Sequence, residues 1–162
     1  MNAPSAYLDT SSIVKRYVEE TGSPVADFIY AKAEAGVHHI VMSLWNVGEV
    51  IGVLDSYRAR ELLDDEALHK ALKSFLAESE KMIRLGSVRI LPLTVDCLTE
   101  TYALVLRHHI YQADALQVAT CKTSASNMFL SADKNLLKVA RTEGLDALNI
   151  ETDKEQITSR FQ

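Results

Sequence analysis

Short apolar runs alternate with longer helical patterns along this sequence, and that alternation constrains the fold more than any other feature. The runs that read as strands are residues 6–9, 39–42, 88–93, 128–131 and, with the weakest pattern, 147–150. Strands that alternate with helices form a parallel sheet whose two faces are covered by helices. We therefore expect an α/β fold, a three-layer α/β/α sandwich around a central parallel sheet.

Apolar residues at helical spacing fill the segments between these runs. The predicted helices are residues 11–20, 24–35, 43–63, 64–86, 95–108, 113–123 and 134–143. The stretch 64–86 begins with acidic residues and ends at Gly86, as helix ends prefer. The first two helices form a pair that the turn "TGS" separates.

Composition indicates one ordinary globular domain, residues 1–162, of which 48% are hydrophobic and 24% charged. No apolar stretch approaches the roughly 20 residues that cross a bilayer, so no membrane partner is expected. The N-terminus lacks the pattern of a secretory signal, and Cys97 and Cys121 form no C-x-x-C motif. These features favour a cytoplasmic location. The net charge of −5 means that a nucleic-acid partner would need a local basic patch or a metal ion.

Four acidic residues stand out by their positions. Asp9 and Asp133 each follow a predicted strand, and α/β folds place their sites beyond the carboxyl ends of the strands. Asp114 falls in the first turn of a predicted helix, where the helix dipole favours negative charge. Glu49 lies one to two turns into an otherwise apolar helix with Ser43 as its N-cap, so its carboxylate must reach water or a partner.

Each acid also has a purely structural explanation. Taken alone, Asp133 is better explained as a helix N-cap than as a ligand. For Asp114, a structural role as a first-turn acid and a functional role are about equally favoured. Asp9 slightly favours a functional role, and Glu49 is the hardest to explain as structure. Carboxylates gathered in one place repel each other unless a cation neutralises them. Oxygen ligands without nitrogen or sulfur suit Mg²⁺ or Mn²⁺.

The sequence resembles PIN-domain proteins, and among them the VapC-like ribonuclease toxins of toxin–antitoxin pairs. The resemblance rests on "YLDTSSIVKRYVEETGS", the helical Glu49, "ADALQVATC" and "FLSADKNLLKVAR", and it spans about residues 7–150. It implies that an acidic quartet of metal-binding and catalytic residues falls on Asp9, Glu49, Asp114 and Asp133. It also implies a polar catalytic residue after the first acid, at Thr10 or Ser11, which would orient Asp9 or contact a water molecule on the metal.

The function that the resemblance implies is a Mg²⁺- or Mn²⁺-dependent endoribonuclease, the toxin of a type II toxin–antitoxin pair. The metal would bind Asp9, Asp114 and Asp133, while Glu49 would hold a water molecule or act as a base. The expected partners are an RNA substrate, a cognate antitoxin whose C-terminal segment lies in the acidic groove, and a second copy of the chain. The chain is longer than a typical toxin, and the extra length falls in residues 61–86.

Three alternatives stay open at this point. A housekeeping RNA-processing nuclease would use the same residues. A catalytically silent PIN-like module that binds proteins would be expected to lack one acid of the quartet. A phosphotransfer or receiver domain would need a second acid beside the first, and "DTSS" has none.

Basic residues and histidines give weaker indications. Lys15 and Arg16 would steer phosphate, although a solvated helix face explains them at least as well. A basic rim for RNA would consist of Lys122, Lys134, Lys138 and Arg141. The pairs 38–39 and 108–109 lack zinc-type spacing, so we expect these histidines to occupy a strand edge and a helix end.

Overall fold

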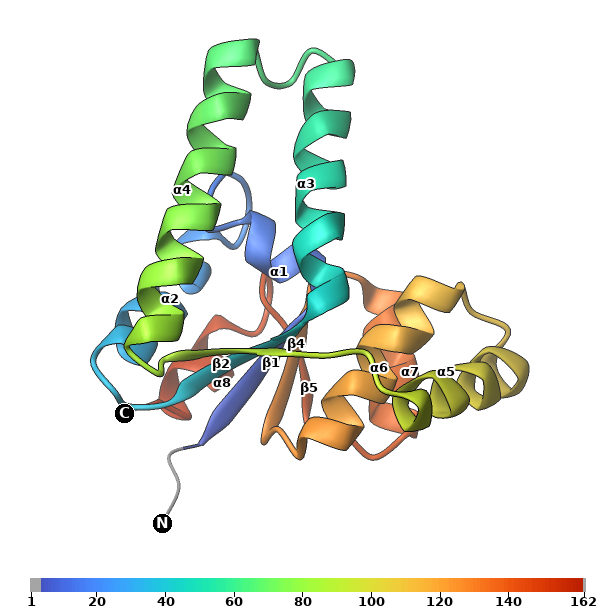
Figure 1. Ribbon diagram of the computed structural model, residues 1–162. Helices are drawn as coiled ribbons and strands as arrows, with labels where there is room; N and C mark the ends of the chain where they lie inside the picture. Colours follow the sequence, from blue (N-terminus) through green and yellow to red (C-terminus); the bar gives the residue numbers. More distant parts are fainter. Residues whose placement is uncertain (1–3, 162) are drawn as a thin grey trace.

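The computed structural model describes residues 4–161, so residues 1–3 of the N-terminal segment considered above and residue 162 lie outside it. Its centre is one sheet of β1 (Ser5–Leu8), β2 (His39–Ser43), β3 (Val88–Leu91), β4 (Met128–Ser131) and β5 (Ala147–Asn149). Every neighbouring pair is parallel, in the order β3-β2-β1-β4-β5 (Figure 1). The five predicted strands and the parallel sheet are confirmed.

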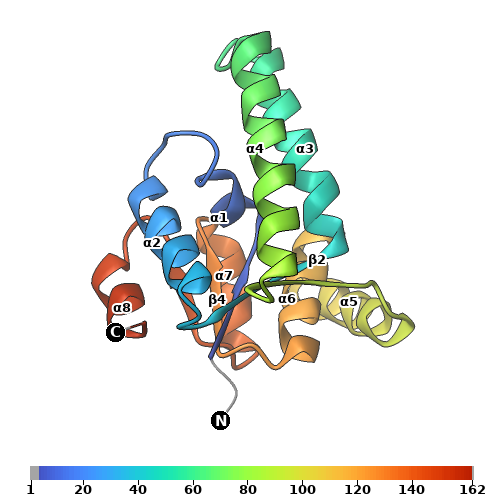
Figure 2. The ribbon, with the colours of Figure 1, turned by 60° about the vertical axis from the view of Figure 1, so that its left-hand side comes forward.

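Helices cover both faces of the sheet. They are α1 (Thr10–Val14), α2 (Ser23–Glu34), α3 (Leu44–Ala59), α4 (Asp65–Arg84), α5 (Val95–His108), α6 (Gln112–Ser124), α7 (Lys134–Thr142) and α8 (Lys154–Ser159). One core lies between the sheet and α1, α2 and α8 and extends along α3 and α4. The other lies between the sheet and α5, α6 and α7 (Figures 1 and 2). The three-layer α/β/α sandwich is therefore confirmed.

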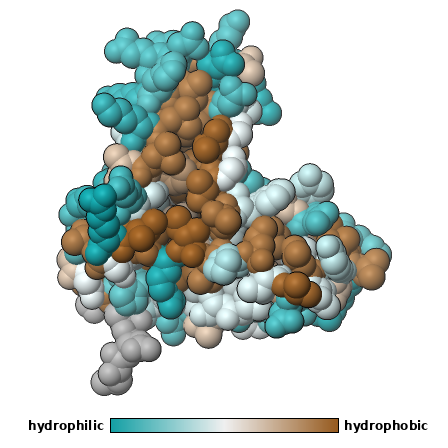
Figure 3. All heavy atoms as spheres, viewed as in Figure 1, coloured by the Kyte–Doolittle hydropathy of each residue, from teal (hydrophilic) through white to brown (hydrophobic). Residues whose placement is uncertain are grey.

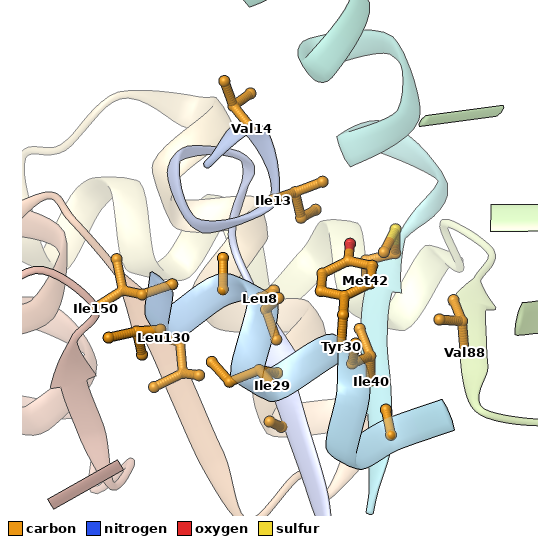
Figure 4. Close-up of a cluster of buried hydrophobic side chains, with 14 of the residues drawn as sticks. Leu8, Ile13, Val14, Ile29, Tyr30, Ile40, Met42, Val88, Leu130 and Ile150 are labelled. Atoms are coloured by element: carbon orange, nitrogen blue, oxygen red, sulfur yellow. The ribbon is translucent and has the colours of Figure 1, made fainter. Parts of the chain in front are cut away.

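Alternate residues of each strand enter opposite cores, because side chains point to the two faces of a sheet in turn. Leu8 of β1 packs with Ile40 of β2 and Leu130 of β4 against Ile29 of α2 (Figure 4). Tyr7, the residue before Leu8 in β1, enters the other core with its register partners Val41 and Phe129. Strands that are buried on both faces read as continuous apolar runs, which is why these segments were visible in the sequence.

The first helix is shorter than predicted. The pattern predicts a helix over residues 11–20, but α1 ends at Val14. Lys15 is buried instead, with its Nζ 2.7 Å from a carboxylate oxygen of Glu151 and 3.2 Å from one of Glu20. The chain then turns at Gly22, whose φ is 94° and where a Cβ would lie 2.9 Å from Cδ of Lys15. Only glycine adopts this positive φ without strain. The ion pairs of Lys15 and the turn at Gly22 thus replace the last turns of the predicted helix.

A long helical hairpin, α3 and α4, projects beyond the sheet (Figures 1 and 2). Residues 61–86, where the sequence predicts extra length, form the end of this hairpin turn and α4. Arg16 fixes it to the body, since its Nε and one terminal nitrogen donate to the two carboxylate oxygens of Glu78 at 3.0 and 2.7 Å. Phe75 of α4 is fully buried and meets the ring of Tyr17 edge to face. Within residues 4–161, no helix combines the length and apolar character needed to cross a membrane.

Candidate functional site

A cleft of about 410 Å³ opens at the carboxyl edge of the sheet, and the acidic quartet lines it. β1 and β4 are neighbours there, and their further neighbours β2 and β5 lie on opposite sides. Such a point, where the strand order reverses direction, is where open α/β sheets place their ligands. The fold thus brings together four acids that lie far apart in the sequence, from Asp9 near its start to Asp133 near its end.

Asp9 directly follows β1 and is the N-cap of α1. Its Oδ1 accepts hydrogen bonds from the Ser12 amide at 3.0 Å and the Ser11 hydroxyl at 2.7 Å, and its Oδ2 accepts one from Ser131 at 2.7 Å. Burial raises the pKa of Asp9 to about 6, although these hydrogen bonds act to lower it. At neutral pH the side chain is an ionised but poorly solvated carboxylate, which favours a nearby cation.

Asp133 follows β4 and is the N-cap of α7. Its Oδ1 accepts from the backbone amides of Asn135 at 2.7 Å and Leu136 at 3.0 Å. The structural explanation of this residue is therefore confirmed. Because both cap bonds use Oδ1, Oδ2 is left for a ligand in the cleft.

Glu49 lies in the second turn of α3, which begins with the predicted cap. The hydroxyl of Ser43 accepts from the amide of Asn46 at 3.2 Å. Two hydrogen bonds reach Oε2 of Glu49, one from the Thr10 hydroxyl at 2.7 Å and one from the Gln117 amide at 2.6 Å. The carboxylate on an apolar helix thus has the polar partners that its position demanded.

Asp114 lies half-buried in the first turn of α6. Helices that lead into a parallel strand begin at the carboxyl edge of the sheet, so this turn faces the ends of β1 and β4. Burial, followed by the charges of Asp133 and Glu49, raises the pKa of Asp114. The acids of the cleft therefore repel one another, and a bound cation would relieve that repulsion.

The two polar residues after Asp9 have separate contacts. The Ser11 hydroxyl donates to Asp9 and accepts from the Ala132 amide at 2.9 Å, so it joins the ends of β1 and β4. Thr10 contacts Glu49 instead. Of the two candidates for a residue that orients Asp9, the geometry favours Ser11.

The donor atoms of the cleft fit a hard divalent cation. Its lining supplies carboxylate and hydroxyl oxygens, and neither Cys nor His is among the described residues that line it. Mg²⁺ and Mn²⁺ are held by one or two carboxylates and several water molecules. Within the part of the chain that the structure describes, no three His, Cys, Asp or Glu side chains converge on one point as a finished metal site. The quartet surrounds the cleft rather than meeting at its centre.

Sequence reasoning missed the buried polar residues beneath the quartet, which are Tyr7, Asn46, Gln117 and Ser131. Gln117 follows Asp114 by three residues, which places both on one side of α6. That spacing was the available signal. The contacts of Tyr7 and Asn46 cross between elements, and no local pattern reveals them.

The basic residues are mostly paired with acids. Lys15 and Arg16 hold carboxylates within the fold, so the prediction that they steer phosphate is not supported. Lys122 is bound by Glu100 and Glu143. Of the proposed basic rim, Lys134 and Lys138 lie exposed on α7, beside Asp133.

Residues 6–142 match the model of the PIN domain family, and the chain belongs to that family. This membership confirms the resemblance seen in the sequence and excludes the alternative of a receiver domain. PIN domains are generally nucleases.

Solved structures with the same fold are distant in sequence. PAE2754 of Pyrobaculum aerophilum matches with a TM-score of 0.67 and 15% identity, over 98% of this chain and 94% of that one. VapC20 of Mycobacterium tuberculosis, a sarcin–ricin loop cleaving toxin, matches at 0.60 and 16%, over 86% and 95%. A toxin–antitoxin complex from Klebsiella pneumoniae matches at 0.52 and 17%, over 79% and 86%. No curated protein matches the chain.

Proposed function

We propose that the protein is a divalent-metal-dependent endoribonuclease of the cytoplasm, and the toxin of a type II toxin–antitoxin pair. The observation that carries this proposal is the gathering of four carboxylates around one cleft at the point where the strand order reverses. Membership of a family of nucleases supports it. We assign Asp9, Glu49, Asp114 and Asp133 as the residues that hold Mg²⁺ or Mn²⁺, and Ser11 as the residue that orients Asp9.

When bound, the cation would activate a water molecule for attack and stabilise negative charge on the scissile phosphate. The protein supplies fixed oxygens for it. Asp9 is held by three hydrogen bonds and Glu49 by two, so neither carboxylate can turn freely. Lys134 and Lys138, which are exposed on α7, would contact phosphates of an RNA strand that enters beside Asp133.

The proposed partner is a small antitoxin that inserts an Arg or Lys side chain among the carboxylates. A cleft lined by carboxylates is a strong target for such a cation, which would also compete with the metal. The fold shared with a toxin–antitoxin complex supports this partner. We further propose that the chain acts as a homodimer.

Cleavage of a generic RNA by the purified protein tests the activity. We expect cleavage with Mg²⁺ or Mn²⁺, loss of cleavage with a chelator, and loss of at least a hundredfold in Asp114→Asn. Asp96→Asn is the matched control, since Asp96 is also a first-turn acid but lies exposed on α5, away from the cleft. Cleavage that persists in the chelator, or that both variants lose equally, would overturn the proposal. An intact protein that cuts no RNA with either metal would favour the silent module.

A second candidate is a housekeeping RNA-processing nuclease, which the same geometry allows. Expression without an antitoxin separates the two. A toxin slows the growth of its host, and the Asp114→Asn variant restores growth. Free growth with an active enzyme would favour the housekeeping role.

A further inference from the structure

A buried polar network lies directly beneath the cleft and ends on one of its carboxylates. We call it the Glu49 network, and it consists of Tyr7 of β1, Thr10 of α1, Asn46 and Glu49 of α3, and Gln117 of α6. Tyr7 and Asn46 are fully buried, and Gln117 is 3% exposed. Burying an amide or a hydroxyl in a core is costly unless every polar atom is bonded.

The first branch runs through Gln117. Its Oε1 accepts from the Tyr7 hydroxyl at 2.7 Å and from Nδ2 of Asn46 at 2.9 Å. Because two donors occupy the carbonyl oxygen, the amide cannot flip. Its Nε2 is thereby directed to Glu49 and donates to Oε2 at 2.6 Å.

The second branch runs through Thr10. Nδ2 of Asn46 donates to the Thr10 hydroxyl at 3.0 Å, and that hydroxyl donates onward to Oε2 of Glu49 at 2.7 Å. Asn46 itself is held by the Ser43 amide and hydroxyl, which donate to its Oδ1 at 2.7 and 2.8 Å. Both branches therefore converge on the same oxygen of Glu49, and Oε1 is left for the cleft.

We propose that Gln117, held in place by Tyr7 and Asn46, is a positioning residue that fixes the carboxylate of Glu49 for cation binding. The inference rests on the proposed metal site. Apolar side chains of similar size would fill this part of the core without the cost of desolvation. Two hydrogen bonds, one from α1 and one from α6, instead reach this carboxylate, and Tyr7 and Asn46 orient the donors behind them. Outer partners of this kind hold a ligand in its binding orientation.

Mn²⁺ binding, measured by calorimetry on the full chain, tests the inference without depending on activity. Gln117→Leu keeps the approximate volume and removes both amide functions. We expect it to weaken Mn²⁺ binding about tenfold, as the loss of an outer partner of a metal ligand does. Tyr7→Phe removes one hydroxyl with little change of shape and serves as the milder second variant, for which we expect a loss of about threefold. Thr101→Val is the control, because Thr101 is buried on α5 and its hydroxyl donates to the carbonyl of Cys97, outside the network.

A double-mutant cycle with Glu49→Gln separates positioning from general loosening of the fold. If Gln117 acts through Glu49, Gln117→Leu causes no further loss of Mn²⁺ affinity once Glu49 is changed. Equal losses in both backgrounds, or wild-type affinity in Gln117→Leu and Tyr7→Phe, would overturn the inference. Failure of the wild-type protein itself to bind Mn²⁺ would instead overturn the proposed function.

Discussion

Asp9 and Asp133 each serve as a helix cap and line the acidic cleft. A cap needs one acceptor oxygen, and a carboxylate has two, so the structural and functional explanations of these residues are compatible. In Asp133 the two cap bonds share Oδ1. Weighing a cap against a ligand as exclusive alternatives, as sequence reasoning does, underestimates acids that follow a parallel strand.

His38 gives a prediction about pH at the scale of one residue. The side chain is fully buried, and neither ring nitrogen has a hydrogen-bond partner within residues 4–161. The ring stacks on Phe161 with centroids 4.0 Å apart. Burial, followed by the charge of His39, lowers the pKa of His38 to about 4. In the unfolded chain the pKa returns to about 6.5, so the unfolded state binds the proton first as pH falls. The contribution of His38 to the free energy of unfolding is therefore complete above about pH 6.5. It is lost progressively as the pH falls from there to about 4.

Urea unfolding at pH 7.5 and pH 5.0 measures this loss. We expect His38→Leu to lose less free energy of unfolding between the two pH values than the wild type does. His69→Gln, at an exposed histidine of α4, should keep the wild-type difference. The same pH difference in His38→Leu and the wild type would contradict the prediction.

At the scale of elements, the sequence predicts the helices and strands that local patterns specify. It does not predict the helix ends and short helices that depend on contacts between distant residues. The strands and most helices could be predicted because strands buried on two faces form continuous apolar runs and amphipathic helices show apolar residues at helical spacing. The end of α1 was not predicted, because the ion pairs of Lys15 with Glu20 and Glu151 replace its last turns. α8 was not predicted either. It is six residues long, and Ile157 is its one buried residue, which is too little for a helical period.

The candidate site follows the same division. Its acids were predicted because strand ends and a helix start mark them in the sequence, and because the resemblance to PIN domains supports the same four positions. The Glu49 network was missed because its members lie on four elements and pair only when the sheet has formed. Residues that position a ligand leave little local trace when they look like ordinary polar residues in a helix.

The turn after α1 gives a prediction at the element scale. Gly22→Ala forces a Cβ into a position 2.9 Å from Cδ of Lys15, at a φ of 94°. We expect it to lower the free energy of unfolding by roughly 1 to 3 kcal/mol. Gly48→Ala is the matched control, since a Cβ there meets nothing within 4 Å and the residue lies inside α3. That variant should gain roughly 0.5 to 1 kcal/mol. Chemical denaturation of both variants checks the pair, and a harmless Gly22→Ala would contradict the prediction.

At the scale of the whole molecule, apolar surface gathers on one side. It follows the inner side of the α3–α4 hairpin and continues past β3 toward α5 (Figure 3). The exposed apolar residues of the hairpin are Leu44, Trp45, Ile51, Leu62, Leu76 and Ile83, and Leu85 follows at its end. Contiguous apolar surface of this kind marks an interaction site.

Light scattering at micromolar concentration tests the proposed homodimer. We expect twice the 18.0 kDa of one chain. Ile83→Glu, on the apolar side of α4, should shift the mass toward a monomer, while Lys73→Glu, at another exposed position of the same helix, should not. A monomer from the wild-type chain would contradict the dimer.

Mn²⁺ calorimetry on Asp9→Asn, beside thermal melts of the metal-free protein, tests the acidic quartet as a cation site most directly. Burial raises the pKa of Asp9 to about 6, so holding its charge above that pH costs the folded state stability. Asparagine retains the shape and the oxygen that caps α1. We predict that Asp9→Asn binds Mn²⁺ at least tenfold more weakly at pH 7.5, while its melting temperature holds or rises. Wild-type Mn²⁺ affinity in Asp9→Asn would contradict the cation site.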